Sequence, residues 1–177
     1  METIKKFVVI GPESTGKSTL CEQLANHYET RWVPEFAREY LLKNGTQYSY
    51  EDLLTIAKNQ VRTEDEHAAA MQNGFLFIDT DMYVMKVWCE FVFGRCHQWI
   101  LDRISERRYD LYLLCNTDLP WVKEPLREYP DLESRLILFH MYKDILVNQQ
   151  TPWKEIRGAN DERLRSAVHS VDRLLAY

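Results

Sequence analysis

The stretch "FVVIGPESTGKST", residues Phe7 to Thr19, decides the expected fold of this chain. Its apolar start leads into Gly11 to Ser18, which match the phosphate-binding pattern of Gly, any four residues and then Gly-Lys-Ser. The pattern requires a strand before the loop and a helix after it, and the apolar run and the amphipathic residues 17–27 supply both. The sequence therefore predicts a loop that holds the phosphates of a nucleoside triphosphate.

The residue types in this loop suit that ligand. Backbone N–H groups of such a loop point inward around an anion, and the following helix adds the positive end of its dipole. Gly16 lets the backbone pass close to a phosphate, Lys17 can reach the β and γ phosphates, and the Ser18 hydroxyl can ligate Mg²⁺. ATP and Mg²⁺ are the expected cofactors.

Composition limits the class of protein. The chain has 177 residues, 45% of them hydrophobic, which is enough for one well-buried core, and we expect a single domain over residues 1–177. The net charge of −5 argues against nucleic acid as the main partner, and no apolar run is long enough for membrane insertion. The cysteines lack metal-site or disulfide-scaffold spacing and are expected to be reduced core thiols of a cytoplasmic protein: Cys21, Cys89, Cys96 and Cys115. Whether the chain forms a homo-oligomer is left open.

Short apolar runs alternate with helical patterns, which predicts a doubly wound α/β fold with a five-stranded parallel sheet. The predicted strands are Lys5–Ile10, Thr30–Val33, Phe75–Asp79, Leu111–Cys115 and Trp153–Ile156. The predicted helices are Lys17–His27, Tyr50–Met71, Asp81–Phe93, Gln98–Arg108, Leu132–Leu146 and Asp161–Leu175, with Ser49 (paired with Asp52) and Asn160 as helix caps. Residues 116–131, with three prolines and mixed charge, are expected to form a mobile lid.

Two acids follow the buried strand "FLFID". Asp79 ends the strand, where the second nucleotide motif places a carboxylate that holds Mg²⁺, although capping of the next helix is the alternative. Asp81 is better placed as that cap, and a role at the substrate is its other interpretation.

The stretch "WVPEFAREY" places another acid at the same sheet edge. Pro34 stops the strand, so Glu35 lies on the loop beside the phosphate site, with Arg38 on its helical face. Glu35 can take the proton of an attacking hydroxyl or bind ribose hydroxyls, and Arg38 can neutralise phosphoryl charge. A surface ion pair is the alternative.

Three further stretches carry weaker signals. In the helix after Asp81, Tyr83, Val87 and Trp88 suit either core packing or ring stacking on a flat substrate. The lid brings Lys123 and Arg127, which can stabilise phosphoryl transfer on closure or belong to a solvated loop. The turn at Gly158 offers backbone groups to a purine edge.

In these motifs the chain resembles the ribosylnicotinamide kinase family, the P-loop kinase domain that forms the C-terminal half of the bifunctional regulator NadR in many bacteria. The resemblance rests on "GPESTGKSTL", "VPEFAREYL", "IDTDMYVMKVWCEFVFG", "LYLLCNTDLPWVKEPLREYPD" and "IRGANDERLRSAV", which cover nearly the whole chain. It implies transfer of the ATP γ-phosphoryl group to the 5′-hydroxyl of nicotinamide riboside, giving nicotinamide mononucleotide in NAD salvage.

The resemblance also implies site residues. The implied ATP-binding residues are Gly11, Glu13, Ser14, Thr15, Gly16, Lys17, Ser18, Thr19, Gly158, Asn160 and Arg163. From the motifs and the resemblance together, the predicted substrate-binding residues are Glu35, Arg38, Asp81, Tyr83 and Trp88, the metal-binding residues are Ser18 and Asp79, and the catalytic residues are Lys17, Glu35, Asp79 and Arg127. Whether Glu35 or Asp79 takes the proton stays open.

Two departures from the family pattern matter. The chain has no room before Gly11 for an adenylyltransferase or DNA-binding domain, so neither activity is expected. In the lid, Glu124 and Pro125 stand where the family pattern has an Asp-Gly pair, so the hinge of the lid departs from that pattern. The alternatives to this activity are a kinase for another nucleoside or nucleotide and a regulatory module that binds and slowly hydrolyses ATP.

Overall fold

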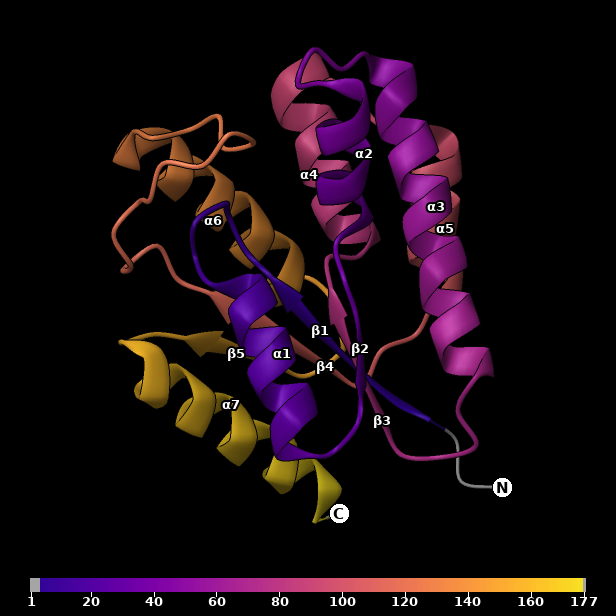
Figure 1. Cartoon of the computed structure of the whole chain (residues 1–177), viewed down its shortest axis with the longest axis vertical. Coiled ribbons are helices and arrows are strands. Elements are labelled where there is room, and N and C mark those ends of the chain that lie inside the picture. Colours follow the sequence, from indigo (N-terminus) through magenta and orange to yellow (C-terminus); the bar gives the residue numbers. More distant parts are fainter. Residues whose placement is uncertain (1–3, 177) are drawn as a thin grey trace.

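Five parallel strands form one sheet through the middle of the molecule (Figure 1). The computed structural model describes residues 4–176, apart from the side chain of Asn160. The strands are β1 (Lys5–Ile10), β2 (Arg31–Val33), β3 (Phe75–Asp79), β4 (Leu111–Cys115) and β5 (Trp153–Ile156), in the spatial order β2-β3-β1-β4-β5. The prediction of a doubly wound α/β fold with a five-stranded parallel sheet is confirmed.

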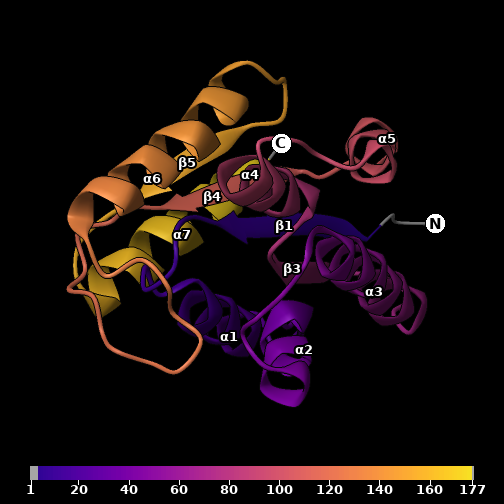
Figure 2. The ribbon, with the colours of Figure 1, turned by 90° about the horizontal axis from the view of Figure 1, so that it is seen from above.

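Helices cover both faces of this sheet (Figure 2). They are α1 (Lys17–His27), α2 (Phe36–Asn44), α3 (Tyr50–Ala69), α4 (Met82–Phe93), α5 (Gln98–Glu106), α6 (Leu132–Val147) and α7 (Asn160–Leu175). Helices α1 and α7 pack on one face, α4 and α6 pack on the other, and α2, α3 and α5 share a third core cluster with α4.

The central strand explains why the sheet is covered on both sides. In β1, Phe7 and Val9 point into the cluster formed with α1 and α7, whereas Val8 and Ile10 point into the cluster formed with α4 and α6. All four side chains are fully buried. A parallel strand buried on both faces reads as a continuous apolar run instead of an alternating one, as this stretch does.

Most predicted boundaries lie within two residues of the observed ones, and α2 is an additional helix. The predicted cap at Ser49 is confirmed, because its Oγ accepts the Asp52 N–H at 3.2 Å and its N–H donates to the Asp52 carboxylate at 2.7 Å. The cap predicted at Asn160 is wrong by one residue. Ala159 is the N-cap, because its N–H donates to the Glu162 carboxylate at 3.0 Å. The helix therefore begins one residue earlier than predicted.

The cysteines form no disulfide with one another. Cys21, Cys89 and Cys115 are buried, as predicted for core thiols, whereas Cys96 is half-buried. Within residues 4–176, no helix combines the length and apolar character that a membrane crossing requires.

Candidate functional site

The phosphate loop leaves β1 after Ile10 and enters α1 at Lys17. Gly11 has φ 146°, and a Cβ there would lie 2.7 Å from the carbonyl oxygen of Cys115, so a larger residue would push the loop away from β4. Gly16 and Ser14 both adopt positive φ values, and the Thr15 hydroxyl donates to the carbonyl of Pro12 at 2.7 Å. The loop is therefore shaped by its own backbone and by its contact with β4.

Lys17, Ser18 and Asp79 meet at the base of this loop. The Lys17 ammonium donates to the carbonyl of Pro12 at 3.0 Å, and the Ser18 hydroxyl donates to the Asp79 carboxylate at 2.5 Å. Burial, reinforced by the negative charge of Glu35, raises the pKa of the fully buried Asp79 to about 6, while Lys17 opposes that shift. The two predicted metal-binding side chains thus lie together, in an environment where a nearby cation would stabilise the carboxylate.

Glu35 is held at the carboxyl end of β2 by a residue that the sequence analysis missed. Gln60 of α3 is buried, and its side-chain oxygen accepts the N–H of Phe36 at 2.8 Å. Its amide nitrogen donates to the main-chain carbonyls of Asp79, at 3.3 Å, and of Pro34, at 3.4 Å. One side chain therefore ties the segment that carries Glu35 to the end of β3. A polar residue on the apolar stripe of α3 was the signal for it.

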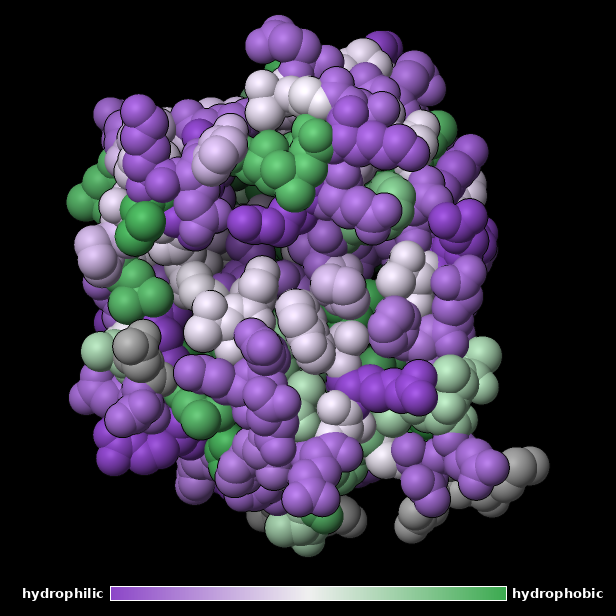
Figure 3. Space-filling view, in the orientation of Figure 1, coloured by the Kyte–Doolittle hydropathy of each residue, from purple (hydrophilic) through white to green (hydrophobic). Residues whose placement is uncertain are grey.

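A cavity of about 310 Å³ opens beside the loop, and Figure 3 shows a hollow in this part of the surface, between the lid and α2. It is lined by every residue of the loop from Gly11 to Thr19 and by Glu35, Ala37, Arg38, Leu41, Val84, Trp88, Phe91, Glu124, Leu126, Arg127, Glu128, Tyr129, Leu138 and Tyr142. The structure thus brings Glu35, Arg38, Trp88 and Arg127 together around the phosphate loop. Asp79 lies directly behind Ser18.

The lid, residues 116–131, is docked on the phosphate loop. The Glu13 carboxylate accepts the main-chain N–H groups of Glu128, at 2.9 Å, and of Tyr129. The Ser14 hydroxyl oxygen accepts the N–H of Val122 at 3.0 Å and a guanidinium N–H of Arg127 at 3.1 Å. Two loop side chains that were predicted to touch ATP therefore also hold the lid, and they bring Arg127 to the cavity.

Trp88 connects the cavity wall to the lid. Its indole N–H donates to the hydroxyl oxygen of Tyr48 at 2.9 Å, and that hydroxyl donates to the Glu128 carboxylate at 2.9 Å. The rings of Tyr48 and Trp88 meet edge to face, with centroids 5.0 Å apart. Trp88 is half-buried and packs against the cluster formed with α2 and α3. It therefore both packs on the core and lines the cavity.

Asp81 and Tyr83, which were predicted to bind the substrate, do not line the cavity beside the phosphate loop. The Asp81 carboxylate caps α4 by accepting the N–H groups of Tyr83 and Val84, and it also accepts the Tyr112 hydroxyl at 2.8 Å. Because the chain turns at Thr80, with φ 78°, Asp81 and Tyr83 line a second cavity of about 390 Å³ instead. Burial raises the pKa of Asp81 to about 7. The neighbouring Val87 is a buried core residue.

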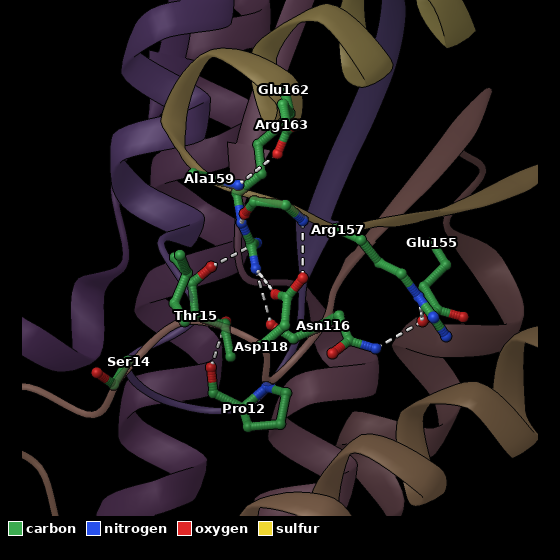
Figure 4. A network of polar contacts seen from close by, with 12 residues as sticks. Pro12, Ser14, Thr15, Asn116, Asp118, Glu155, Arg157, Ala159, Glu162 and Arg163 are labelled. Atoms are coloured by element: carbon green, nitrogen blue, oxygen red, sulfur yellow. Dashed lines mark hydrogen bonds and ion pairs between the residues drawn. The ribbon is translucent and has the colours of Figure 1, made fainter.

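Arg163 contacts the loop at Thr15 (Figure 4) and is not among the residues that line the cavity. Its guanidinium donates to the main-chain carbonyls of Thr15 at 2.9 Å, Asn116 at 3.0 Å and Gly158 at 2.8 Å, and it forms an ion pair with Asp118. Asp118 in turn accepts the N–H of Gly158 at 2.7 Å. Arg163 is buried and joins the loop, the end of β4 and the start of α7. The side chain of Asn160, also predicted to bind ATP, lies outside the described part.

Residues 6–163 match the model of a protein family described as an AAA domain. The chain belongs to this AAA-domain family. Among curated proteins it is 32% identical over 177 residues to the trifunctional NAD biosynthesis/regulator protein NadR of Escherichia coli and 27% identical over 179 residues to that of Salmonella typhimurium. Each match covers 97% of this chain but 43% of the relative, so the chain spans less than half of their length. The resemblance seen in the motifs is confirmed as homology to NadR.

Solved structures show the same fold. The structure of NadR with NAD and AMP-PNP matches with a TM-score of 0.74 at 22% identity, over 98% of this chain and 50% of that one. NadR in complex with NR gives a TM-score of 0.73, at the same identity, over 98% and 52% of the two chains. Thymidylate kinase from Ehrlichia chaffeensis gives 0.67 at 14% identity, over 98% and 99%. The architecture is therefore that of P-loop kinases.

Proposed function

We propose that this AAA-domain protein transfers the γ-phosphoryl group of ATP to the 5′-hydroxyl of nicotinamide riboside. The observation that carries the proposal is one cavity that joins the phosphate loop, the acid Glu35 and the aromatic Trp88 beneath a docked lid. Such a cavity can hold a triphosphate and a flat nucleoside end to end. The homology to NadR, a protein of NAD biosynthesis, and the likeness to a NadR complex with NR support this substrate.

Ser18 and Asp79 would hold the magnesium ion. Their oxygen atoms are the hard donors that Mg²⁺ prefers, and this ion takes its other ligands from phosphates and water. Among the described residues there is no cluster of three or more His, Cys, Asp or Glu able to hold a metal. Burial disfavours the charged form of Asp79 and raises its pKa, so a bound cation would stabilise this carboxylate. When bound, Mg²⁺ would neutralise charge on the phosphates.

Glu35 is the better placed of the two acids to take the proton. It lines the cavity, whereas Asp79 is buried behind Ser18 and is engaged by that hydroxyl. In the proposed step the riboside oxygen forms a bond to the γ-phosphorus, the bond to the bridging oxygen of ADP breaks, and the hydroxyl proton moves to Glu35. Nicotinamide mononucleotide and ADP are the products.

Lys17 and Arg127 would stabilise the charge that develops on the transferred group. Lys17 lines the cavity with its ammonium group on the carbonyl of Pro12, and Arg127 comes from the lid, where Ser14 holds it. The lid, residues 116–131, is docked on the phosphate loop, so a nucleotide bound beneath it would be covered and next to Arg127, which would limit wasteful hydrolysis. Lys123, the second lid cation, is exposed and does not line the cavity.

The remaining assignments complete the proposed site. Arg38 lines the cavity but also pairs with Glu124 of the lid at 3.3 Å, so its role is contact with the riboside or with the closed lid. Gly158 does not line the cavity, and its N–H and carbonyl are engaged by Asp118 and Arg163, so this turn supports the loop from behind and is not assigned to the adenine. Residues 1–177 would act as a single kinase domain.

A direct assay tests this proposal. The purified protein is incubated with MgATP and nicotinamide riboside, and both ADP and nicotinamide mononucleotide are measured by chromatography. Equal amounts of the two products, with little ADP when riboside is omitted, are expected. Uridine and thymidine serve as alternative acceptors, and faster turnover of either would replace the proposed substrate. ADP formed at one slow rate with every acceptor would indicate a regulatory ATPase instead.

A further inference from the structure

The lid brings two carboxylates to the cavity wall, and their partners differ. Glu124 is paired with two arginines, Arg127 at 2.9 Å and Arg38 at 3.3 Å. Glu128, in contrast, forms no ion pair with any residue in the described part of the chain. Its carboxylate accepts the neutral Tyr48 hydroxyl at 2.9 Å. Glu128 therefore presents an uncompensated negative charge at the cavity.

The surroundings of Glu128 favour a cation. Trp88, Phe91 and Tyr129 line the same cavity, and the rings of Phe91 and Tyr129 meet edge to face with centroids 5.2 Å apart. Aromatic faces attract cations through their quadrupole. Burial raises the pKa of Glu128, the Tyr48 hydroxyl opposes this shift, and the negative charge of Glu13 adds to it, so a positive group placed here would relieve the repulsion between the two carboxylates.

We infer that Glu128 determines specificity by selecting a nucleoside whose base carries a fixed positive charge. The inference rests on the proposed function, because the pyridinium ring of nicotinamide riboside is such a base and the rings of uridine and thymidine are neutral. The charge of a pyridinium nitrogen bonded to ribose cannot be lost by deprotonation. Glu128 would therefore favour this substrate over neutral nucleosides of similar size across the working pH range.

The sharpest test compares nicotinamide riboside with its reduced 1,4-dihydro form, which has nearly the same shape but no charge. The ratio of their kcat/KM values is measured for the wild type and for Glu128→Gln. The glutamine keeps an oxygen that can accept the Tyr48 hydroxyl, so the lid contact is retained while the charge is removed. Glu128 is partly exposed to solvent, and we expect the preference for the cation to fall roughly tenfold, mainly through KM.

Two matched variants separate charge from structure. Tyr48→Phe removes the hydrogen bond to Glu128 but keeps the charge, and its preference for the cation is expected to stay close to that of the wild type. Glu133→Gln removes an exposed carboxylate at the start of α6 and controls for net charge, with no expected change in either rate.

The outcomes are distinguishable. An unchanged ratio in Glu128→Gln, with riboside phosphorylation intact, would overturn the inference and leave the proposed function standing. A wild type that phosphorylates neither form of the riboside would refute the proposed function itself. If Glu128→Gln does not fold, the wild-type ratio is measured at rising ionic strength. Screening should then lower the preference for the cation, and a constant ratio would contradict a role for charge.

Discussion

Arg163→Met should lower both the stability of the fold and the affinity for ATP. The substitution removes hydrogen bonds to the carbonyls of Thr15, Asn116 and Gly158 and leaves Asp118 without its cation. Breaking a buried ion pair costs about 3–5 kcal/mol, and charge-assisted hydrogen bonds contribute about 1.5–3 kcal/mol each. The Asp118 side chain is 33% exposed, so solvent screens part of this loss.

We therefore expect the free energy of unfolding to fall by about 3 kcal/mol, which lowers Tm by roughly 6–12 °C for a chain of this size. Because Arg163 supports the loop at Thr15, KM for ATP should rise while KM for the riboside changes little. Urea unfolding and steady-state kinetics with each substrate varied in turn measure the two effects.

Two results would refute this reasoning. If Arg163→Met lost affinity for ATP with no loss of stability, Arg163 would contact the nucleotide directly, as the family resemblance implied. If neither property changed, the buried network of Figure 4 would contribute nothing. The double variant Arg163→Met with Asp118→Asn serves as a control. It leaves no unpaired carboxylate and should recover part of the lost stability.

Three other changes test the site. Lys17→Ala should reduce turnover by about a thousandfold or more by removing a phosphate contact, and retained activity in the chromatographic assay would contradict the proposed site. Gln60→Leu should lower kcat about tenfold or more by releasing the segment of Glu35, with the affinity for ATP, measured by calorimetry, nearly unchanged. Asp79, whose pKa of about 6 in the folded protein exceeds its unfolded value, binds its proton more tightly when folded, so its contribution to stability declines as pH rises from about 4 to 6. Asp79→Asn should therefore raise the stability of the nucleotide-free protein at pH 8 by about 3 kcal/mol, with little change at pH 4, while abolishing activity. Equal stabilisation at both pH values in urea unfolding would contradict this.

Strong local patterns made the sheet predictable from sequence. The strand of Phe7 to Ile10 is buried on both faces, and the pattern of the phosphate loop fixes what must precede and follow it. Helix α2 was not predicted as an element of its own because it is short and largely exposed, with Leu42 65% exposed. Its signal is weak without the helix against which it packs.

Parts of the site could not be predicted for a different reason. A carboxylate just after a strand can cap a helix or bind a metal ion, and the local sequence of Asp79 and Asp81 is compatible with both. The structure separates them, since only Asp79 meets Ser18. Gln60 and Tyr48 act on partners 24 and 40 positions away, so no pattern within one segment could reveal them.

The contact between Glu13 and the lid has a consequence for how this protein can change over evolution. Glu13 accepts main-chain N–H groups, which every residue except proline supplies whatever its side chain. The side chains at positions 128 and 129 can therefore vary without loss of this contact. The main chain of the lid makes the docking contact, whereas side chains of the lid line the cavity. The side chains can therefore change during evolution while the docking contact is kept.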